Sequence, residues 1–293
     1  FFRISAKFSF NHLENIITAA NDDHKKLIKI DGTKISKISE LYQYVKVVYF
    51  SPEDINLISG GPTNRRKFID LAISQSSYKY LEDLRLYHRI LKQRNALLKS
   101  DFSRNEKISW DTKFIEIGTR IIISRKKYLK EFIPGLSEKY FFVSGKRENL
   151  DVEYKHSFPT SEFEEFSNSF ANHLERIESD EMRLQRTLAG PHLDDIIFKI
   201  DNNIARNFGS QGQKRSLVIT ARLVQADIIK RKDSEAPILI FDDVLADLDR
   251  GRAQRIMDLL GEEHQIFIAT PNIELYEKFN LERIDLENLL NEK

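Results

Sequence analysis

The pattern of apolar and polar residues divides the chain into three parts, and the first part favours strands. Residues 1–10 alternate apolar and polar side chains with the period of two that is typical of a strand. Residues 27–30 are rich in apolar side chains and lead into Asp31-Gly32, a two-residue hairpin signal. Residues 45–50 form another β-rich run before Ser51-Pro52. Residues 1–50 are therefore predicted to form strands joined by turns.

The second part favours helices. Ser51-Pro52 combines a capping side chain with a proline at the first helical position. Leucines recur at heptad spacing in residues 78–99, and a second apolar face runs through residues 110–132. Two long helices in succession predict an antiparallel helical arm. Short strands are expected within residues 141–154, and a further helix over residues 161–184.

The third part returns to strands. Apolar runs at residues 196–200 and 204–208 flank Asp201-Asn202-Asn203 and predict a hairpin. A helix is expected over residues 251–260 and a strand over residues 265–269. We therefore predict two units: residues 1–50 and 176–293 form a head, and residues 51–175 form a helical arm.

The stretch from residue 208 to residue 249 carries the most specific pattern. It opens with the polar turn Ser210-Gln211-Gly212-Gln213, and a helical run follows, with Leu217, Ala221, Val224 and Ile228 at helical spacing. After Pro237, residues 238–241 are uniformly apolar, too short for a helix, and followed by Asp242 and Asp243. This pattern predicts a buried parallel strand whose tip lies at the carboxyl edge of an α/β sheet, where ligands bind. An ordinary buried strand that ends in a solvated acidic turn is the alternative.

Taken together, these features resemble the signature motif, Walker B strand and D-loop of ABC-type ATPase heads, a group that includes SMC-like proteins. The resemblance implies that Asp242 holds Mg²⁺ and that Asp243 orients or deprotonates the water that attacks ATP. These roles suit phosphoryl transfer, which depends mainly on positioning and charge neutralisation. Ser210 and the Gly212 amide, near a helix N-terminus, would make an anion site suited to a γ-phosphate. The nucleotide-binding residues implied are Ser210, Gln211, Gly212, Gln213, Asp247 and Asp249.

Composition excludes several classes of site. The chain has no cysteine, so it has neither disulfides nor thiolate metal sites, and its histidines lack the spacing of zinc ligands. The net charge is only +1, so a nucleic-acid surface has to be a local patch. No run approaches the length of a membrane span and no signal-peptide pattern is present. A cytoplasmic protein is therefore expected.

Three groups of basic residues are candidates for DNA contact, because lysine and arginine bind phosphates irrespective of base sequence. An ordinary solvated helix face is the alternative for each residue. The groups are Arg65, Arg66 and Lys67 beside a Gly-Pro break; Arg85, Arg89, Lys92 and Lys99 along one stripe of the predicted helix 78–99; and Arg125, Lys126, Lys127 and Lys130. His192, which follows Gly190-Pro191, could contact nucleotide, but a role in holding this turn is favoured.

Several stretches in order resemble one family, RecF, over nearly the whole chain. They are residues 47–54, 64–70, 87–99, 190–195 and 210–216. The resemblance implies an α/β fold, an ABC-type P-loop NTPase head with an antiparallel β-subdomain and an inserted helical lobe. It also implies binding of ATP with Mg²⁺, DNA binding, ATP-dependent homodimerisation, and action with RecR and RecO at single-strand gaps to help load recombinase.

The sequence departs from the family pattern at three places. Leu193 stands where the family usually has arginine, and Ala269-Thr270-Pro271 stands where two threonines are common. The phosphate-binding motif G-x-x-x-x-G-K-[ST] occurs nowhere, since the only Gly-Lys pair is Gly145-Lys146. Because this motif precedes the β-subdomain in the family, we expect that an N-terminal segment is missing from the sequence. A weak ATPase is then expected in the full-length protein and little activity in residues 1–293; the alternative is a non-hydrolysing DNA-binding or scaffold module of another SMC-like head.

Overall fold

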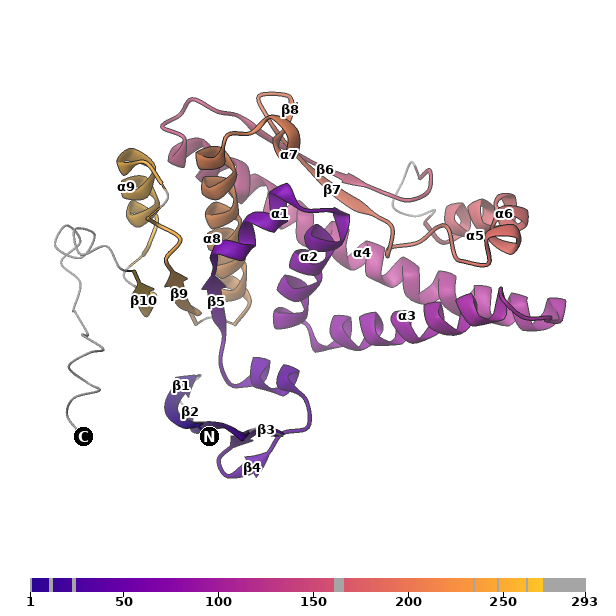
Figure 1. The fold of residues 1–293 in the computed structure, drawn as a ribbon, viewed down its shortest axis with the longest axis horizontal. Coiled ribbons are helices and arrows are strands. Elements are labelled where there is room, and N and C mark those ends of the chain that lie inside the picture. The colour runs from indigo at the N-terminus through magenta and orange to yellow at the C-terminus, as the bar shows by residue number, and fades with distance from the viewer. Residues whose placement is uncertain are drawn as a thin grey trace.

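The structure is a computed structural model, and it describes residues 2–10, 13–22, 25–160, 166–233, 235–246, 248–261 and 263–270. Two antiparallel sheets and one parallel sheet are connected by helices, and a pair of long helices extends away from the parallel sheet (Figure 1). No helix in these ranges is long and apolar enough to cross a membrane.

The N-terminal sheet is a four-stranded antiparallel meander, with neighbouring strands paired in sequence order. Asp31 and Gly32 have φ angles of 48° and 80°, which a two-residue hairpin turn requires, so the predicted turn is confirmed. One strand of this sheet, residues 13–22, was not singled out by the sequence pattern. The elements are β1 (Phe2–Phe10), β2 (Leu13–Asp22), β3 (Lys25–Ile30) and β4 (Thr33–Lys34), and the 3-10 helix η1 (Ile38–Gln43) follows.

A parallel sheet of three strands carries the acidic tip, in the order β10-β9-β5. All its strands run the same way, so their carboxyl ends meet at one edge. Val48, Leu239 and Phe241 are buried, and the rings of Phe50 and Phe241 stack with centroids 4.0 Å apart. The predicted buried parallel strand at residues 238–241 is therefore confirmed. The strands are β5 (Val47–Phe50), β9 (Ile238–Asp242) and β10 (Ile266–Ala269).

Helix α8 (Gln211–Asp233) joins the parallel sheet to the helical part of the molecule. Leu217 and Val224 belong to the large core that includes α4, whereas Ile219 and Leu223 belong to the smaller core around the parallel sheet. A helix that is apolar on both sides is a core helix. The start of α8 is thereby fixed relative to both cores.

The helical part is built on α2 (Pro62–Ser76), α3 (Tyr78–Leu97) and α4 (Arg104–Val143). The expected antiparallel pair is present as α3 and α4 (Figure 1), but α4 is longer than predicted at both ends. It continues through Pro134 to Val143, where strands were expected. Leu136, Tyr140 and Val143 are fully buried, and this packing offsets the hydrogen bond that proline removes.

The third sheet is antiparallel, with the order β6-β7-β8. Strand β6 follows α4 in sequence and pairs with β7, so the segment that contains α5 and α6 begins and ends at neighbouring strands. The predicted hairpin is confirmed at Asp201 and Asn202, but its second strand ends at Ile204 and a helical turn follows. The predicted helix 161–184 is two helices, and residues 161–165 lie outside the described ranges. The elements are β6 (Leu150–Lys155), α5 (Phe166–Arg176), α6 (Glu178–Leu184), β7 (Asp195–Ile200), β8 (Asn203–Ile204) and α7 (Ala205–Phe208).

Three short elements complete the described chain. The expected helix start at Ser51-Pro52 is confirmed, although it gives the 3-10 helix η2 (Pro52–Ile55) before α1 (Asn56–Ser59). The helix predicted over residues 251–260 is α9 (Arg250–Asp258). It is the first helix after β9, from which residues 243–249 separate it.

Candidate functional site

Asp242 is the last residue of β9, at the carboxyl edge of the parallel sheet. Its carboxylate is half-buried and accepts a short hydrogen bond from the hydroxyl of Tyr49 on the neighbouring strand β5. This hydrogen bond raises the pKa of Tyr49. The tyrosine therefore holds the Asp242 carboxylate at the sheet edge without neutralising its charge.

Asp243 makes the turn away from the sheet. Its φ angle is 50°, in the left-handed region, which aspartate tolerates better than most residues. Its N–H donates to the carbonyl of Ala269 at 2.8 Å, so β10 fixes this turn. The Asp243 side chain is exposed. Uncommon backbone conformations of this kind are found at functional sites, and here one aims a carboxylate at solvent beside Asp242.

The Ser210-Gln213 turn opens α8 with a reciprocal cap. The Gln213 N–H donates to Ser210 Oγ at 3.2 Å, and the Ser210 N–H donates to Gln213 Oε1 at 2.7 Å. Ser210 and Gln211 are exposed, and a Cβ placed on Gly212 would meet no atom within 4 Å. The turn thus presents hydroxyl and amide groups to open solvent at the positive end of a helix.

The predicted D-loop is residues 246–249, and the structure describes three of these four residues. Asp249 caps α9, since its carboxylate accepts from the Arg252 N–H at 2.9 Å, and the Arg252 side chain also pairs with Glu148. Asp247 lies outside the described residues. Asp249 therefore has a structural role, and its role toward nucleotide stays a prediction.

The acidic edge fits a magnesium ion that is shared with phosphates. No group of three or more acidic or histidine side chains that could hold a metal occurs in the described residues. Mg²⁺ in ATPases, however, is bound by one or two carboxylates together with substrate phosphates and water. Asp242, whose described partner is a neutral hydroxyl, supplies a carboxylate of this kind.

The three basic residues of helix α2 lie in different environments. Arg65 is only 5% exposed; it pairs with Asp195 at 2.7 Å and donates to the Gly60 carbonyl at 2.8 Å. Arg66 is half-buried against the Asp194 carbonyl, at 2.7 Å, and Lys67 is exposed. Because successive helical residues differ by roughly 100° in direction, the three residues do not form one patch, and Arg65 faces away from the pocket that Arg66 and Lys67 line. Lys67 alone of the three is exposed, and Arg65 serves the junction of α2 with β7.

The stripe on α3 is exposed only in part. Arg89 and Lys92 are exposed, whereas Arg85 is half-buried and donates to Ser39 Oγ at 2.8 Å. Lys99 is exposed but follows the end of α3 at Leu97. The predicted single helical stripe is thus wrong for Lys99, because the helix stops before it.

The residues of the third basic group also differ in how far they are buried. Arg125 is buried; it pairs with Asp70 at 2.8 Å and donates to the Pro191 carbonyl at 2.6 Å. Lys126 is half-buried and lies over the ring of Phe166, 4.6 Å from its centroid. Lys127 and Lys130 are exposed. The predicted patch is wrong for Arg125, which binds α4 to α2 and to the Gly190-Pro191 turn.

His192 has the structural role that was predicted, since it packs within the turn that follows Gly190-Pro191. Its Nδ1 lies 2.6 Å from the Tyr87 hydroxyl, and burial, then the nearby Arg66, lower the pKa of His192 to about 4. Gly190 has a φ of 130°, and a Cβ there would lie 2.7 Å from the Tyr87 hydroxyl. The turn therefore requires glycine, and the neutral imidazole is part of its packing.

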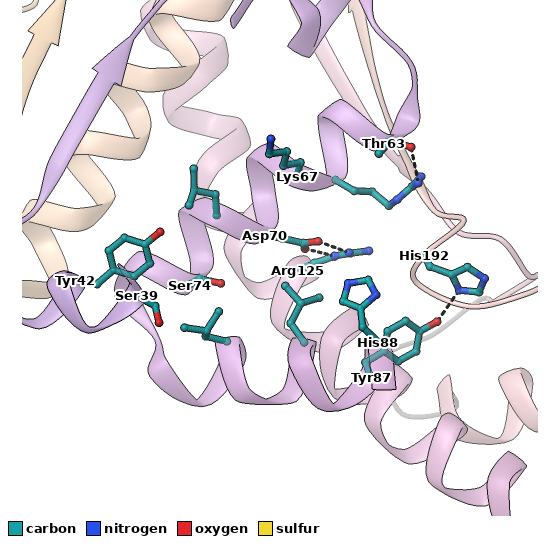
Figure 2. Close-up of a pocket in the computed structure, with 14 residues that line it drawn as sticks. Ser39, Tyr42, Thr63, Lys67, Asp70, Ser74, Tyr87, His88, Arg125 and His192 are labelled. Carbon is teal, nitrogen blue, oxygen red and sulfur yellow. Dashed lines mark hydrogen bonds and ion pairs between the residues drawn. The ribbon is translucent and has the colours of Figure 1, made fainter. Parts of the chain in front are cut away.

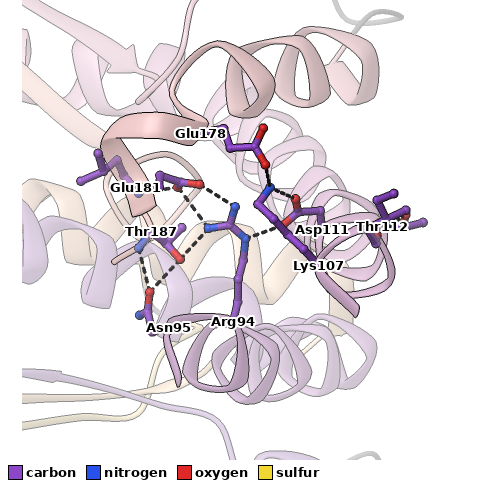
Figure 3. A network of polar contacts seen from close by, with 10 residues as sticks. Arg94, Asn95, Lys107, Asp111, Thr112, Glu178, Glu181 and Thr187 are labelled. Carbon is purple, nitrogen blue, oxygen red and sulfur yellow. Dashed lines mark hydrogen bonds and ion pairs between the residues drawn. The ribbon is translucent and has the colours of Figure 1, made fainter. Parts of the chain in front are cut away.

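Two buried polar groups were missed by sequence reasoning. Asp194 accepts from the Tyr154 hydroxyl at 2.7 Å and from the Ser157 N–H at 2.8 Å. Burial acts to raise the pKa of Asp194, but its hydrogen bonds outweigh burial and lower it. Arg94 is the centre of the second group, which is shown in Figure 3. Both residues lie in stretches that resemble the family, but their buried contacts could not be predicted, because most of the partners come from distant parts of the chain.

The molecule combines a parallel sheet with an acidic carboxyl edge, a Ser-Gln-Gly-Gln turn that opens α8, and inserted helices. It is an α/β head with the ABC-type ATPase fold. The chain is 37% identical over 251 residues to the DNA replication and repair protein RecF of Streptococcus gordonii, covering 85% of this chain and 69% of the relative. It is 35% identical over 257 residues to RecF of Desulfitobacterium hafniense, covering 86% and 70%. The chain belongs to the RecF family of DNA replication and repair proteins.

Solved structures have the same fold. The recombination mediator protein RecF of the RecFOR pathway with ATP superimposes with a TM-score of 0.78 at 30% identity, covering 92% of this chain and 74% of that one. RecF with ATPrS gives a TM-score of 0.80 at 29% identity, covering 93% and 75%. No family model matches the sequence.

Proposed function

We propose that this chain is an ATP-dependent DNA-binding protein of recombinational repair that acts as an ATP-gated DNA clamp at single-strand gaps and helps to load recombinase. One observation carries the proposal. A single chain places two acids at the carboxyl edge of a parallel sheet and exposes a Ser-Gln-Gly-Gln turn at the start of α8. The relatives that bind ATP in solved structures support this assignment.

The two acids have different proposed roles because their environments differ. Asp242, held by Tyr49 at the strand tip, would bind Mg²⁺, which when bound neutralises phosphate charge. Asp243 is exposed one residue further on and would orient or deprotonate the attacking water. Ser210 and the amides at the start of α8 would donate to the γ-phosphate held by a second copy of the chain. This arrangement makes nucleotide binding and dimerisation one event.

DNA would be bound by the exposed basic residues that remain after the buried ones are set aside. Phosphate contacts of this kind give affinity that is independent of base sequence and that falls with salt. RecR, RecO and a second copy of the chain are the proposed protein partners, in the cytoplasm. The proposed DNA contacts are Lys67, Arg89, Lys92, Lys99, Lys127 and Lys130, with Arg66 and Arg85 half-buried beside them.

A second candidate function is a DNA-binding or scaffold module that does not hydrolyse ATP. The observation that favours it is the absence of the phosphate-binding motif from residues 1–293. The two functions differ in one measurable property. An ATP-gated clamp binds DNA more tightly when nucleotide is present, whereas a scaffold module does not.

DNA binding tests the proposal directly. In fluorescence anisotropy with a gapped duplex, the double variant Arg89→Glu/Lys92→Glu should lose about tenfold or more in affinity and about two units of salt slope. Lys26→Glu, at an exposed lysine on β3, is the matched control and should bind normally. If Arg89→Glu/Lys92→Glu binds DNA with wild-type affinity, these two residues do not contact DNA. In a version of the protein that carries the phosphate-binding motif, ATP should tighten binding, and no effect of ATP would favour the scaffold module.

A further inference from the structure

A pocket of about 540 Å³ lies between η1, α2, α3 and the turn that carries His192 (Figure 2). It is distinct from the acidic edge of the parallel sheet, whose residues do not line it. Its walls are mainly carbon, from the side chains of Leu71, Leu81 and Leu84 and the ring of Tyr42. Apolar concave surfaces with a few polar groups are typical of binding sites.

A second pocket of about 250 Å³ adjoins the first. The two share Ser39, Tyr42, Ser74 and Leu81, so they form one groove between η1 and the first half of α3. We call this the η1–α3 groove. A groove with two adjoining compartments suits an extended chain that places side chains in each, more than it suits one compact ligand.

The first compartment carries positive charge at its mouth. Asp70 and Arg125 pair with each other at 2.8 Å, so their charges balance. Arg66 hydrogen-bonds neutral groups, the Asp194 carbonyl at 2.7 Å and Thr63 Oγ at 3.1 Å, and Lys67 is exposed beside it. Burial and the neighbouring Arg125 lower the pKa of Arg66, as expected for a half-buried cation close to another. A carboxylate at this mouth would be complementary in charge.

We propose that the η1–α3 groove binds an extended acidic peptide segment of a partner protein. An aliphatic or aromatic side chain of the peptide lies against Leu81 and Leu84, and a flanking carboxylate pairs with Arg66 and Lys67. Nucleic acid fits the groove less well, because a phosphate backbone needs unpaired cations spaced along its whole length. Here Arg66 and Lys67 lie in the first compartment, whereas Arg125 and Lys46, which also line the groove, are each paired with a carboxylate. An interface of this size is expected to be weak and transient.

Peptide selection tests this inference with the whole chain. A random octapeptide library displayed on phage, selected against the protein, should enrich sequences that place Asp or Glu next to Leu, Ile or Phe. The most enriched peptide, synthesised with a fluorescent label, should then bind in anisotropy experiments. Its affinity should fall about tenfold or more with Lys67→Glu, which reverses a charge at the mouth, and with Ser74→Trp, which fills the wall common to both compartments.

The controls separate the groove from general charge and from DNA binding. Lys79→Glu makes the same charge reversal as Lys67→Glu, at an exposed site on α3 outside the groove. It should leave peptide affinity unchanged. Because Lys67 is on the surface, its variant should fold even if Ser74→Trp does not. The inference is overturned if no acidic sequence is enriched, or if Lys67→Glu and Lys79→Glu bind the peptide equally. If the wild-type protein binds no selected peptide and Ser74→Trp loses affinity for the gapped duplex, the groove is instead a nucleic-acid site.

Discussion

At the scale of single residues, burial separates charged side chains that hold the fold together from those that can reach a ligand. Arg65 and Arg125 were candidates for DNA contact, yet each is buried against a carboxylate and a backbone carbonyl. A buried guanidinium needs such partners because desolvation of an unpaired charge is costly. Asp243 is the opposite case, since its turn is fixed by Ala269 and its carboxylate is exposed.

The first prediction concerns the two acids at the sheet edge. In a version of the protein that carries the phosphate-binding motif, Asp243→Asn should keep ATP binding and lower turnover by about a hundredfold or more. Asparagine also tolerates a left-handed backbone, so the turn should persist. Asp242→Asn should instead weaken ATP binding that depends on Mg²⁺. Turnover assays and calorimetry with and without Mg²⁺ measure both effects, and equal turnover in Asp243→Asn and wild type would exclude the catalytic role.

The second prediction concerns pH and His192. Its pKa is about 4 in the folded chain, lowered mainly by burial, and near 6.5 when unfolded. The unfolded chain therefore takes up the proton first, so this contribution to stability is complete above about pH 6.5 and is lost as the pH falls toward 4. In urea unfolding across this range, His192→Gln should flatten the loss of stability. His88→Gln, at an exposed histidine, is the control, and an unchanged pH dependence in His192→Gln would contradict the argument.

At the scale of elements, one buried ionic network fixes the far end of the helical part. Arg94 on α3 is 1% exposed and donates to Glu181 on α6, which is 0% exposed, to Asp111 on α4 at 2.8 Å, and to Thr187 at 2.9 Å (Figure 3). Every nitrogen of the guanidinium thus has an acceptor. Three helices and the strand connection after α6 meet at this one side chain, so their relative positions depend on it.

The third prediction follows from this network. Glu181→Gln removes one of the two carboxylates that accept from Arg94 and leaves the ion pair with Asp111. It should lower the free energy of unfolding by about 1.5–3 kcal/mol, as for hydrogen bonds to charged groups. Arg94→Met/Glu181→Leu removes both charges and should lose less than the sum of the single changes. Arg183→Ala, which breaks the exposed pair with Asp180, should lose about 0–1 kcal/mol. Urea denaturation measures all three; equal losses for Glu181→Gln and Arg183→Ala would show that the network adds little.

At the scale of the whole molecule, α8 connects the Ser210–Gln213 turn to both cores. Ser210 and Gln211 are exposed, and the apolar faces of α8 then pack against the parallel sheet on one side and α4 on the other. A displacement of the start of α8 would therefore change its packing against both the parallel sheet and the helical part. This arrangement suits a head in which a second copy of the chain closes on nucleotide.

The fourth prediction tests that closure. In a version of the protein that carries the phosphate-binding motif, Ser210→Arg should abolish ATP-dependent dimerisation and retain ATP binding by the monomer. The loss of the cap to Gln213 should cost the fold only about 1 kcal/mol. Sedimentation with a non-hydrolysable ATP analogue measures the dimer. A dimer of normal strength would mean that Ser210 is only a helix cap.

The fifth prediction concerns the chain of 293 residues by itself. It should bind ATP poorly, because it lacks the motif whose amides and lysine supply most phosphate contacts. Isothermal titration calorimetry decides this point, and micromolar affinity would contradict it.

The sequence by itself determined those features whose cause is local. An apolar run that ends in two aspartates specifies a buried strand with a polar tip, and Asp31-Gly32 specifies a hairpin, since both depend on neighbouring residues. The Ser-Gln-Gly-Gln turn is of the same kind, because a helix start is built from residues three positions apart. These signals were sufficient to predict the parallel strand, the hairpin turn and the start of α8.

Only the tertiary structure decided which residues are buried and what they contact. The length of α4 beyond Pro134, the pairing of β6 with β7 and the burial of Arg65, Arg94 and Arg125 all depend on partners far away in sequence. An arginine has the same local signature whether it faces solvent or a carboxylate 130 residues away, as Arg65 does with Asp195. The η1–α3 groove could not be predicted for the same reason, because its walls combine η1, α2 and α3 with Arg125, His192 and Asp233, which are far apart in the sequence.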